Sequence, residues 1–414
     1  MSIPDHPLVA TSVSRRAALQ LALAAAAGMA VPTAFGSSRG KGTAANPFAA
    51  VDTMAESLIA GHVTPGLSLA VMRAGNLLYA KGYGAANLET NTPVTPETVF
   101  RVGSISKQFI ATAIALLAEE GKLGYDDPLS KFLPLFPRAH DITLRQMLTH
   151  TSGLGNYTET QPPTAFFRQA RTDYSDAELL AAMANTSPLF KSEPGMAWAY
   201  SNTAYVLLGM VVQVVSGEAY GEFLRRRLFE PAGLMSTAVD DAADVVRNRA
   251  SGYSAKTPTA PGTPGGIRNA EYISMTFPGA AGAMRSTASD LCRWHAALLG
   301  GRIVKPETLQ LMLTPALLKN GELPEAPVPP NAPKDAPREK MRYGFGLATG
   351  EFEGHSFVEH DGGIFGFISM LRSYQREKVT VALLMNYDGF SSLEQLKTVR
   401  DVRDAAARIA AGMS

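Results

Sequence analysis

The chain has almost no cysteine, since its 414 residues include only Cys292 and no internal disulfide can form. Cys292 lies in a segment with the pattern of an amphipathic helix, where we expect a small core residue and not a nucleophile. The sequence also lacks a His-Glu-x-x-His motif, a Cys/His cluster, a P-loop and a dinucleotide fingerprint in context. It therefore predicts no metal site and no cofactor.

An excess of charge of one sign is also missing. Only 18% of the residues are charged and the net charge is +1, so nothing indicates a nucleic-acid partner or an anionic membrane surface. No Gly-x-Ser-x-Gly stands between a strand pattern and a helix pattern, so nothing indicates the nucleophile elbow of the α/β-hydrolases. We expect a small-molecule or peptide substrate. The oligomeric state stays open.

One long apolar run lies close to the N-terminus. Ser14, Arg15 and Arg16 precede the Ala/Leu-rich residues 17–30, and small residues follow. This order is typical of an export signal, and the arginine pair favours the twin-arginine route. A permanent membrane anchor is the second interpretation, because the run is rich in alanine and barely long enough to span a bilayer. We expect a cleaved signal over 1–36, a linker over 37–46, a periplasmic or secreted protein, and no membrane span afterwards.

Strand patterns gather at both ends of the chain. Two apolar runs around Ala74-Gly75-Asn76 predict a hairpin, residues 47–60 and 392–411 predict helices, and the middle is mostly helical. The implied fold class is α+β, with an antiparallel sheet flanked by helices, built from both chain ends, and an inserted mostly helical domain. The α/β domain is expected at 47–124 and 281–414, and the helical domain at 125–280. The strand predictions are 67–73, 77–83, 344–348, 357–360, 367–374 and 379–386.

A serine and a lysine are spaced for chemistry at Ser104-Ile105-Ser106-Lys107. Residues three apart share one face at the start of a helix, so an amine lies beside a hydroxyl that needs a base. Burial would lower the lysine pKa, and helix N-terminal amides would favour an oxyanion. A helix cap is the plain alternative for Ser104. Ser38 and Lys41 repeat the spacing in the linker, where neither a strand nor an apolar helix adjoins them.

A second motif is Tyr200-Ser201-Asn202. A tyrosine near a lysine can ionise partly and pass a proton to a leaving group. The amide of Asn202 can hold both a lysine and a substrate carbonyl. Taken alone, the motif more often means a buried tyrosine that donates to a backbone carbonyl.

The third motif is His360-Asp361-Gly362-Gly363. Glycines beside a strand allow a ligand to approach the backbone closely, and a polar side chain there would line a cleft. A turn pair is the alternative for His360 and Asp361. The alternation of a strand would place these two side chains on opposite faces.

In the order Ser-x-x-Lys, Tyr-x-Asn, His-x-Gly, the chain resembles the serine β-lactamase and penicillin-binding protein family. The resemblance is to its class C-like branch, which includes D-Ala-D-Ala carboxypeptidases and β-lactamase-like esterases, and it runs from about residue 51 to 387. Further segments that carry it are 100–107, 148–154, 228–234 and 285–291.

The resemblance implies roles for the motif residues. Ser104 would form an acyl-enzyme, Lys107 would act as base, and Tyr200 would exchange protons with the leaving group and then with water. Asn202, His360 and Gly362 would bind substrate. The N–H groups of Ser104 and Gly363 would form the oxyanion hole.

The third motif departs from the Lys-Thr-Gly of potent β-lactamases of the branch. A neutral His360 would not grip a substrate carboxylate as that lysine does. We therefore expect hydrolysis of an ester, an amide or a D-amino-acid peptide bond. A true β-lactamase and a non-catalytic penicillin-binding sensor or scaffold are the alternatives, but three intact motifs favour an enzyme.

Four further side chains have weaker signals. We expect His150 to fix a loop by hydrogen bonding and Arg285 to be structural. Tyr157 and Trp198 are candidates for the wall of the cleft, although Trp198 fits a core position equally well. The Pro-rich residues 323–337 are expected to overhang the site.

Overall fold

A computed structural model of the protein describes residues 46–159, 162–256, 266–326, 339–390 and 393–413. The chain divides into two units, Met1–Asn46 and Pro47–Ser414. The predicted export signal and all of the predicted linker except Asn46 lie outside the described residues. Every described helix and strand belongs to the second unit.

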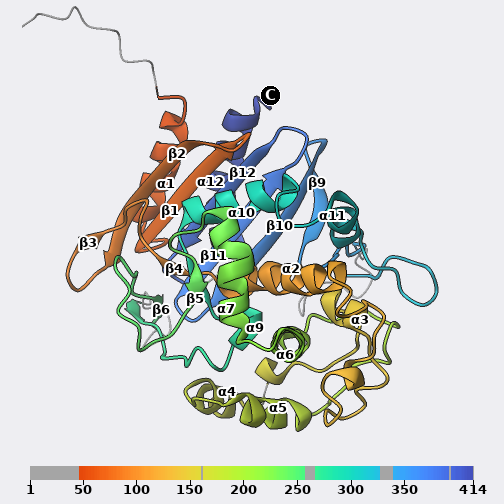
Figure 1. The fold of residues 1–414 in the computed structure, drawn as a ribbon. Helices are drawn as coiled ribbons and strands as arrows, with labels where there is room; N and C mark the ends of the chain where they lie inside the picture. The colour runs from red at the N-terminus through yellow and green to blue at the C-terminus, as the bar shows by residue number, and fades with distance from the viewer. Residues whose placement is uncertain (1–45, 160–161, 257–265, 327–338, 391–392, 414) are drawn as a thin grey trace, which may run out of the picture. The chain divides into compact units, whose positions relative to one another are not determined.

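Seven strands form one sheet in which every pairing is antiparallel (Figure 1). The N-terminal strand β1 pairs with the last strand, β12, so that Leu67 lies opposite Met385. This confirms the predicted fold class, a sheet built from both ends of the chain and flanked by helices. In order across the sheet the strands are β3 (Thr92–Pro93), β2 (Asn76–Asn87), β1 (Gly66–Arg73), β12 (Val379–Met385), β11 (Phe367–Tyr374), β10 (His355–Ile364) and β9 (Ala348–Phe352).

Helices cover both faces of the sheet. Along β1, Leu69 and Val71 belong to the cluster that packs under α1 (Ala49–Ala60) and α12 (Leu393–Ala411). The alternate residues, Ala70 and Met72, belong to the larger cluster on the side of α10 (Ala288–Leu299). Side chains of successive strand residues point to opposite faces, so the almost unbroken apolar runs of β1 and β12 reflect a sheet buried on both sides.

The segment that carries Ser104 crosses from a small sheet into the core. Strand β4 (Phe100–Arg101) pairs with β8 (Met284–Ser286), which in turn pairs with β5 (Ala238–Val239). A 3₁₀ turn, Gly103–Ile105, then leads into α2 (Ser106–Glu119), which is buried from Ser106 to Leu117. Ser104 thus lies in the turn before the helix and not in its first α-helical turn.

The regular elements among the described residues of 125–280 are mainly helices, with the short strands β5, β6 (Tyr253–Ala255) and β7 (Ile267–Asn269). The domain boundaries at 125 and 280 stay a prediction. Among the described residues no single helix is long and apolar enough to cross a membrane, and one bent pair meets the length and composition test only together. The helices are α3 (Leu144–Leu148), α4 (Pro163–Ala170), α5 (Asp176–Ala184), α6 (Asn202–Ser216), α7 (Tyr220–Leu224) and α8 (Glu230–Ala232); α9 (Gly279–Gly282) and α11 (Pro306–Leu313) come later in the chain.

One predicted strand is displaced. The expected strand over 344–348 is wrong, because β9 begins at Ala348 and runs to Phe352. Gly346 has a positive φ of 68°, and a Cβ there would lie 2.8 Å from the carbonyl oxygen of Lys107. The chain therefore turns against α2 before it extends. Residues 257–265 and 327–338, which include most of the predicted Pro-rich overhang, lie outside the described residues.

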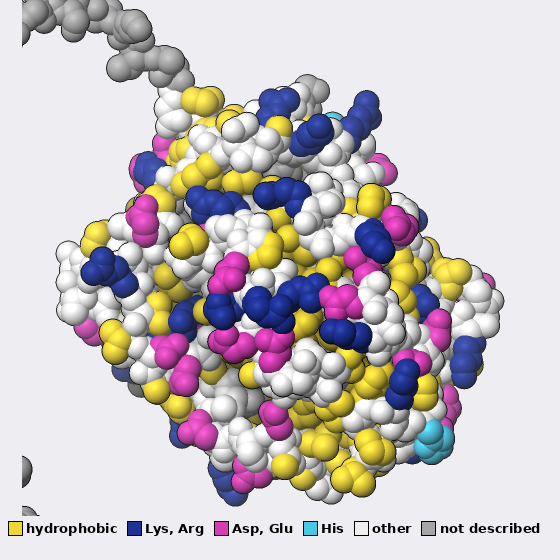
Figure 2. Space-filling model, viewed as in Figure 1, with side chains coloured by type: hydrophobic (Ala, Val, Ile, Leu, Met, Phe, Trp, Pro, Cys, Tyr) yellow, Lys and Arg dark blue, Asp and Glu magenta, His cyan; other side chains and the backbone are white. Residues whose placement is uncertain are grey.

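Basic and acidic side chains lie intermixed on the face seen in Figure 2. Arg225, for example, pairs with both Glu222 and Glu230. Cys292, in contrast to these surface side chains, is fully buried in α10. This burial raises the pKa of its thiol to about 12. This confirms its predicted place in the core.

Candidate active site

The first two motifs meet at the Ser104 hydroxyl. Lys107 Nζ lies 3.0 Å from Ser104 Oγ, and Tyr200 Oη donates a hydrogen bond to the same oxygen at 2.7 Å. Lys107 comes from the first turn of α2, and Tyr200 from the loop that ends in α6. The structure thus brings together the predicted nucleophile, base and proton carrier, from parts of the chain about a hundred residues apart.

Lys107 is fully buried, and burial lowers the pKa of its amine well below the ordinary value. Besides Ser104, its Nζ contacts Asn202 Oδ1 and the carbonyl oxygen of Ala281, each at 2.8 Å. A neutral amine has two N–H groups and one lone pair. Because the two oxygens can only accept, they take both N–H groups and leave the lone pair for Ser104. The amine is therefore oriented to receive the serine proton.

The amide of Asn202 is held in turn by a loop that the sequence did not single out. Its Nδ2 donates to Thr158 Oγ1 at 2.9 Å, and the Thr158 hydroxyl donates to Asn156 Oδ1 at 2.8 Å. These bonds keep the oxygen of Asn202 towards Lys107. Asn202 begins α6 beside Ser201, whose hydroxyl accepts from Ala204 N and caps the helix.

The surroundings of Tyr200 favour its neutral phenol over the partial ionisation expected from the sequence. Burial raises the pKa of its phenol far above the usual 10, and its hydrogen bond with Ser104 offsets only part of this rise. Lys107 Nζ lies 4.7 Å from the centre of its ring. A neutral phenol in this position has a proton to donate towards Ser104, and the part of Tyr200 in a reaction stays a prediction.

Two glycines let strand β10 come against the turn that holds Ser104. A Cβ on Gly362 would lie 2.1 Å from Val102 O and 3.0 Å from Ser104 N, and a Cβ on Gly103 would lie 2.8 Å from Gly363 O. At Gly363, by contrast, an added Cβ would meet nothing within 4 Å. The backbones of Ser104 and Gly363 thus meet at the open cleft, where an oxyanion hole needs its donors. Their use as donors stays a prediction.

The side chain of His360 is occupied within the protein. Its Nδ1 lies 2.6 Å from Asp361 O, and its Nε2 lies 2.9 Å from Tyr343 Oη. A carbonyl only accepts, so Nδ1 carries the proton and Nε2 accepts from Tyr343. Burial lowers the pKa of His360 to about 4, so the ring is neutral at pH 7 as expected. Direct contact of His360 with substrate stays a prediction.

Asp361 lies on the opposite side of β10 from His360. Its Oδ2 is 3.6 Å from the guanidinium Nη2 of Arg400, which belongs to α12 on the far face of the sheet. The alternation expected from the sequence therefore keeps this carboxylate away from the Ser104 side.

Three of the weaker sequence candidates are now placed. The backbone N–H of Ser201 donates to His150 Nδ1 at 3.2 Å, which confirms that His150 fixes a loop. Arg285 is structural, since it pairs with Asp240 at 2.9 Å. Trp198 packs against the rings of His150 and Tyr200 and is not among the residues that line the cleft.

The cleft at Ser104 has a volume of about 450 Å³. Ser104, Asn202, Thr158 and Gly363 line it, and Tyr157 does so as predicted, with its hydroxyl donated to Phe277 O. Most of the remaining wall is apolar. Among the described residues that line it, Asp388 is the one carboxylate, and none is a lysine or an arginine. The apolar side chains are Phe166, Ile273, Phe277, Ile364, Phe365 and Ile368.

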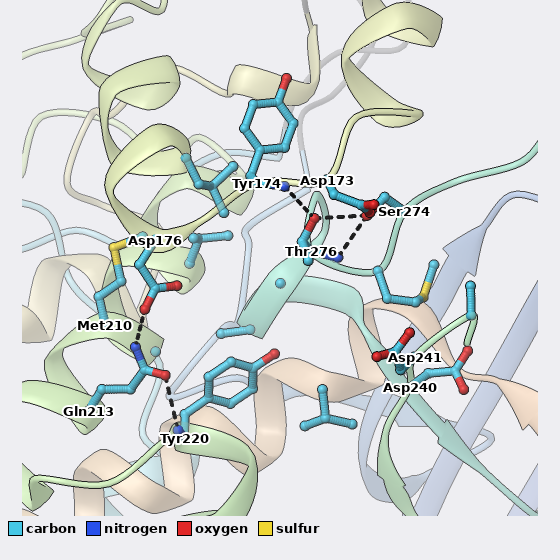
Figure 3. A pocket seen from close by; sticks show the side chains of 18 of the residues that line it. Asp173, Tyr174, Asp176, Met210, Gln213, Tyr220, Asp240, Asp241, Ser274 and Thr276 are labelled. Atoms are coloured by element: carbon cyan, nitrogen blue, oxygen red, sulfur yellow. Dashed lines mark hydrogen bonds between the residues drawn. The ribbon is translucent and has the colours of Figure 1, made fainter. Parts of the chain in front are cut away.

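A second cavity, of about 530 Å³, lies apart from Ser104 (Figure 3). Asp176 accepts there from Gln213 Nε2 at 2.7 Å, and Asp173 accepts from Ser274 Oγ at 2.5 Å. Among the described residues that line it there is no serine–lysine pair. Its other charged and aromatic side chains are Asp240, Asp241, Tyr174, Tyr220 and Tyr272. The described residues also hold no group of three or more His, Cys, Asp or Glu side chains placed to bind a metal ion.

Comparison with known proteins assigns the family. The family model described as Beta-lactamase matches residues 51–404. The chain belongs to the Beta-lactamase family. Penicillin-binding protein 4* of Bacillus subtilis (strain 168) is 29% identical over 357 residues, which are 83% of this chain and 73% of that protein.

Solved structures related to this Beta-lactamase family member include two amidases. D-amino acid amidase from Ochrobactrum anthropi SV3, complexed with L-phenylalanine amide, is 25% identical with a TM-score of 0.72, over 88% of this chain and 98% of that chain. D-stereospecific amidohydrolase from Streptomyces sp. is 28% identical with a TM-score of 0.67, over 84% and 97%. The protein is accordingly a β-lactamase-related serine hydrolase, and these relatives are compatible with the class C-like branch.

Sequence reasoning missed the residues that complete the site. The carbonyl of Ala281 leaves no side-chain signal, because any residue supplies the same oxygen. Thr158 lies in a single 3₁₀ turn, Tyr157–Glu159, which is too short to give a periodic sequence pattern. The apolar wall gathers from α4, from the segment before α9 and from the turn after β10, which only the tertiary fold brings together.

Proposed function

We propose that the protein hydrolyses an ester or amide with an apolar acyl group through an acyl-enzyme on Ser104, including D-amino-acid amides or peptides. The observation that carries this proposal is the buried amine of Lys107, whose N–H groups are taken by Asn202 and Ala281 while its lone pair faces Ser104. Serine requires such a base to attack a carbonyl at neutral pH.

The proton route follows from the two groups that touch Ser104 Oγ. Lys107 takes the serine proton as Oγ bonds to the carbonyl carbon, and the negative oxygen forms beside the N–H groups of Ser104 and Gly363. Tyr200 gives its proton to the leaving group as the C–O or C–N bond breaks, and Lys107 returns the first proton to Tyr200. Water then attacks the acyl carbon by the reverse route, and Ser104 leaves with a proton.

The lining of the cleft supports esters and amides over penicillins. Penicillins carry a carboxylate, whereas the described lining residues offer Asp388 and no lysine or arginine. The D-amino acid amidase and D-stereospecific amidohydrolase relatives support an amide substrate. A slowly deacylating penicillin binder is the second candidate, favoured by the likeness to penicillin-binding protein 4*.

We also propose that the protein is exported through the twin-arginine route to the periplasm or beyond. Arg15 and Arg16 before the apolar residues 17–30 support this proposal. N-terminal sequencing of the protein made in its native host should find a mature start close to residue 37. A start at Met1 or Ser2 would contradict it.

Intact mass spectrometry of residues 37–414 tests the reaction. Wild-type protein incubated with a p-nitrophenyl ester should show a transient acyl adduct and turnover. Ser104→Ala should lose both. Ser38→Ala removes the serine of the other Ser-x-x-Lys spacing and should behave as wild type.

Incubation with penicillin, followed by the same mass measurement, distinguishes an esterase or amidase from a penicillin binder and from a true β-lactamase. A drug that remains intact beside a hydrolysed ester supports the esterase or amidase proposal. A lasting adduct of drug mass on Ser104 would indicate the penicillin binder, and a drug that gains water would indicate a true β-lactamase. Adduct on Ser104→Ala would remove Ser104 from the mechanism.

A further inference from the structure

The charge in the cleft at Ser104 is negative, which does not suit a ligand that carries a carboxylate, as penicillins do. Asp388 lines the cleft, and no lysine or arginine lies among the other described lining residues. Lys107 touches Ser104, but its side chain is fully buried and is not among the residues that line the cleft. A ligand in this cleft therefore meets one negative charge within a mostly apolar wall.

The backbone fixes where this charge lies. Asp388 follows the end of β12 by three residues, and its Oδ2 accepts from the N–H of Gly366 at 2.8 Å. Gly366 belongs to the turn between β10 and β11, three residues after Gly363. Three extended residues span at most about 11 Å, so the carboxylate lies within roughly 14 Å of the backbone N of Gly363. A single acyl group can reach from one to the other.

One oxygen of Asp388 remains for a ligand. Oδ2 is used to hold the turn, whereas Oδ1 has no hydrogen-bond partner among the described residues. The side chain is half-buried beside Phe365 and Ile368, which also line the cleft. A partly desolvated carboxylate is stabilised by a hydrogen bond from a charged donor, because this bond replaces the hydrogen bonds to water that were lost. Asparagine could hold the turn equally well, so the turn alone does not account for a charge here.

We propose that Asp388 selects substrates whose acyl group carries a free ammonium at the end of an apolar stretch. The methylene or aromatic part of the acyl group would pack on the phenylalanine and isoleucine wall while its carbonyl carbon lies at Ser104. The ammonium would donate to Asp388 Oδ1. This inference names the substrate class of the proposed function and rests on it.

Matched pairs of p-nitrophenyl esters test the proposal. The 6-aminohexanoyl ester is compared with the heptanoyl ester, and the 8-aminooctanoyl ester with the nonanoyl ester, because each pair differs by one terminal ammonium in place of a methyl group. For the better-fitting length we expect kcat/KM to favour the ammonium by about tenfold, as for a hydrogen bond between charged groups. Added salt should reduce this preference.

Two variants show whether Asp388 is responsible. Asp388→Asn keeps an acceptor for Gly366 and should bring the ratio close to one while turnover of the neutral ester is retained. Asp241→Asn removes the same charge from the second cavity and should keep the wild-type ratio.

The outcomes separate the two proposals. Equal kcat/KM for both members of each pair in wild-type protein, or a preference that survives in Asp388→Asn, would overturn the inference while the hydrolase proposal stands. Failure of every ester to acylate Ser104 would overturn the proposed function and the inference with it.

Discussion

Two of the cavities formed by the described residues, the cleft at Ser104 and the second cavity, are similar in volume but differ in the chemistry of their walls. The larger one, at about 530 Å³, collects four carboxylates and three tyrosines. The smaller one, at about 450 Å³, has a single carboxylate and a mostly apolar wall. Only the smaller one adjoins a buried amine in contact with a serine, at Lys107 and Ser104. Chemistry at this fold therefore follows from one desolvated base and not from the size or polarity of a cavity.

One strip of chain forms the wall between the two cavities. Ile273, Phe277, Pro278, Ala281 and Gly282 line the cleft at Ser104. The residues between them, Ser274, Met275, Thr276, Gly279 and Ala280, line the second cavity. The carbonyl that holds Lys107 thus belongs to a segment whose other side faces the larger cavity. Because the two cavities share this wall, matched substitutions on its two sides can be compared directly.

The largest effect is expected at the base. Lys107→Met keeps the length of the side chain but removes the proton acceptor, so the acylation rate should fall by about 10²–10⁴-fold. In wild-type protein the rate should decline as the pH drops through the lowered pKa of Lys107, because protonation removes the lone pair. Stopped-flow release of p-nitrophenol across pH measures both. A variant rate that keeps the wild-type pH profile would assign the base elsewhere.

The same tyrosine substitution in each cavity should have unequal effects. Tyr200→Phe keeps the ring between His150 and Trp198 but loses the proton carrier, so kcat should fall about a hundredfold. Tyr220→Phe in the second cavity should leave kcat unchanged. Steady-state kinetics with one ester measures kcat for both variants and for wild-type protein. Near-normal turnover by Tyr200→Phe would mean that a group other than Tyr200 transfers the proton.

A smaller loss is expected where Asn202 is positioned. Thr158→Val removes the acceptor of Asn202 Nδ2, so the amide can rotate and present an N–H to Lys107. We expect kcat to fall about tenfold with little change in KM, by the cost of one misdirected hydrogen bond. Thr158→Ser keeps the hydroxyl and should restore the rate. If valine and serine behave alike, Thr158 has no positioning role.

The smallest effect is expected from charge in the second cavity. Asp176→Asn keeps an acceptor for Gln213 and should alter kcat/KM by less than about twofold, since Asp176 is exposed and salt screens exposed charges. The measurement is the same ester assay at physiological salt. A larger change would mean that the shared wall transmits the state of the second cavity to Lys107.

Much of the fold could be predicted because its signals are local. The hairpin around Ala74 and Gly75 and the paired apolar strands near the C-terminus follow from turn chemistry and alternation. The strand expected at 344–348 was wrong because apolar residues there pack in a turn against α2, with Gly346 pressed to the backbone of Lys107. That contact depends on a helix more than 200 residues earlier, which no local pattern records.

The site residues, like the fold, include some that local sequence signals predict and some that depend on tertiary contacts. Ser104, Lys107, Tyr200 and Asn202 were predicted because each motif has a fixed spacing of chemically distinctive side chains, and the structure brings all four together. The orientation of the amine could not be predicted, since it depends on a backbone carbonyl at Ala281 and on a loop threonine. The neutral state of Tyr200 was also missed, because the burial that raises its pKa is a property of the folded protein.

The backbone acceptor at Ala281 limits how the Ser-x-x-Lys motif can be transplanted. A tetrapeptide grafted onto the start of another helix would carry the serine and the lysine, but not the carbonyl some 170 residues away that holds one N–H of the amine. A designed enzyme would need a peptide group at that place, and a side-chain scan of this protein would not reveal the requirement. Replacing the Ala281–Gly282 amide linkage by semisynthesis would alter this acceptor, which point substitution cannot do.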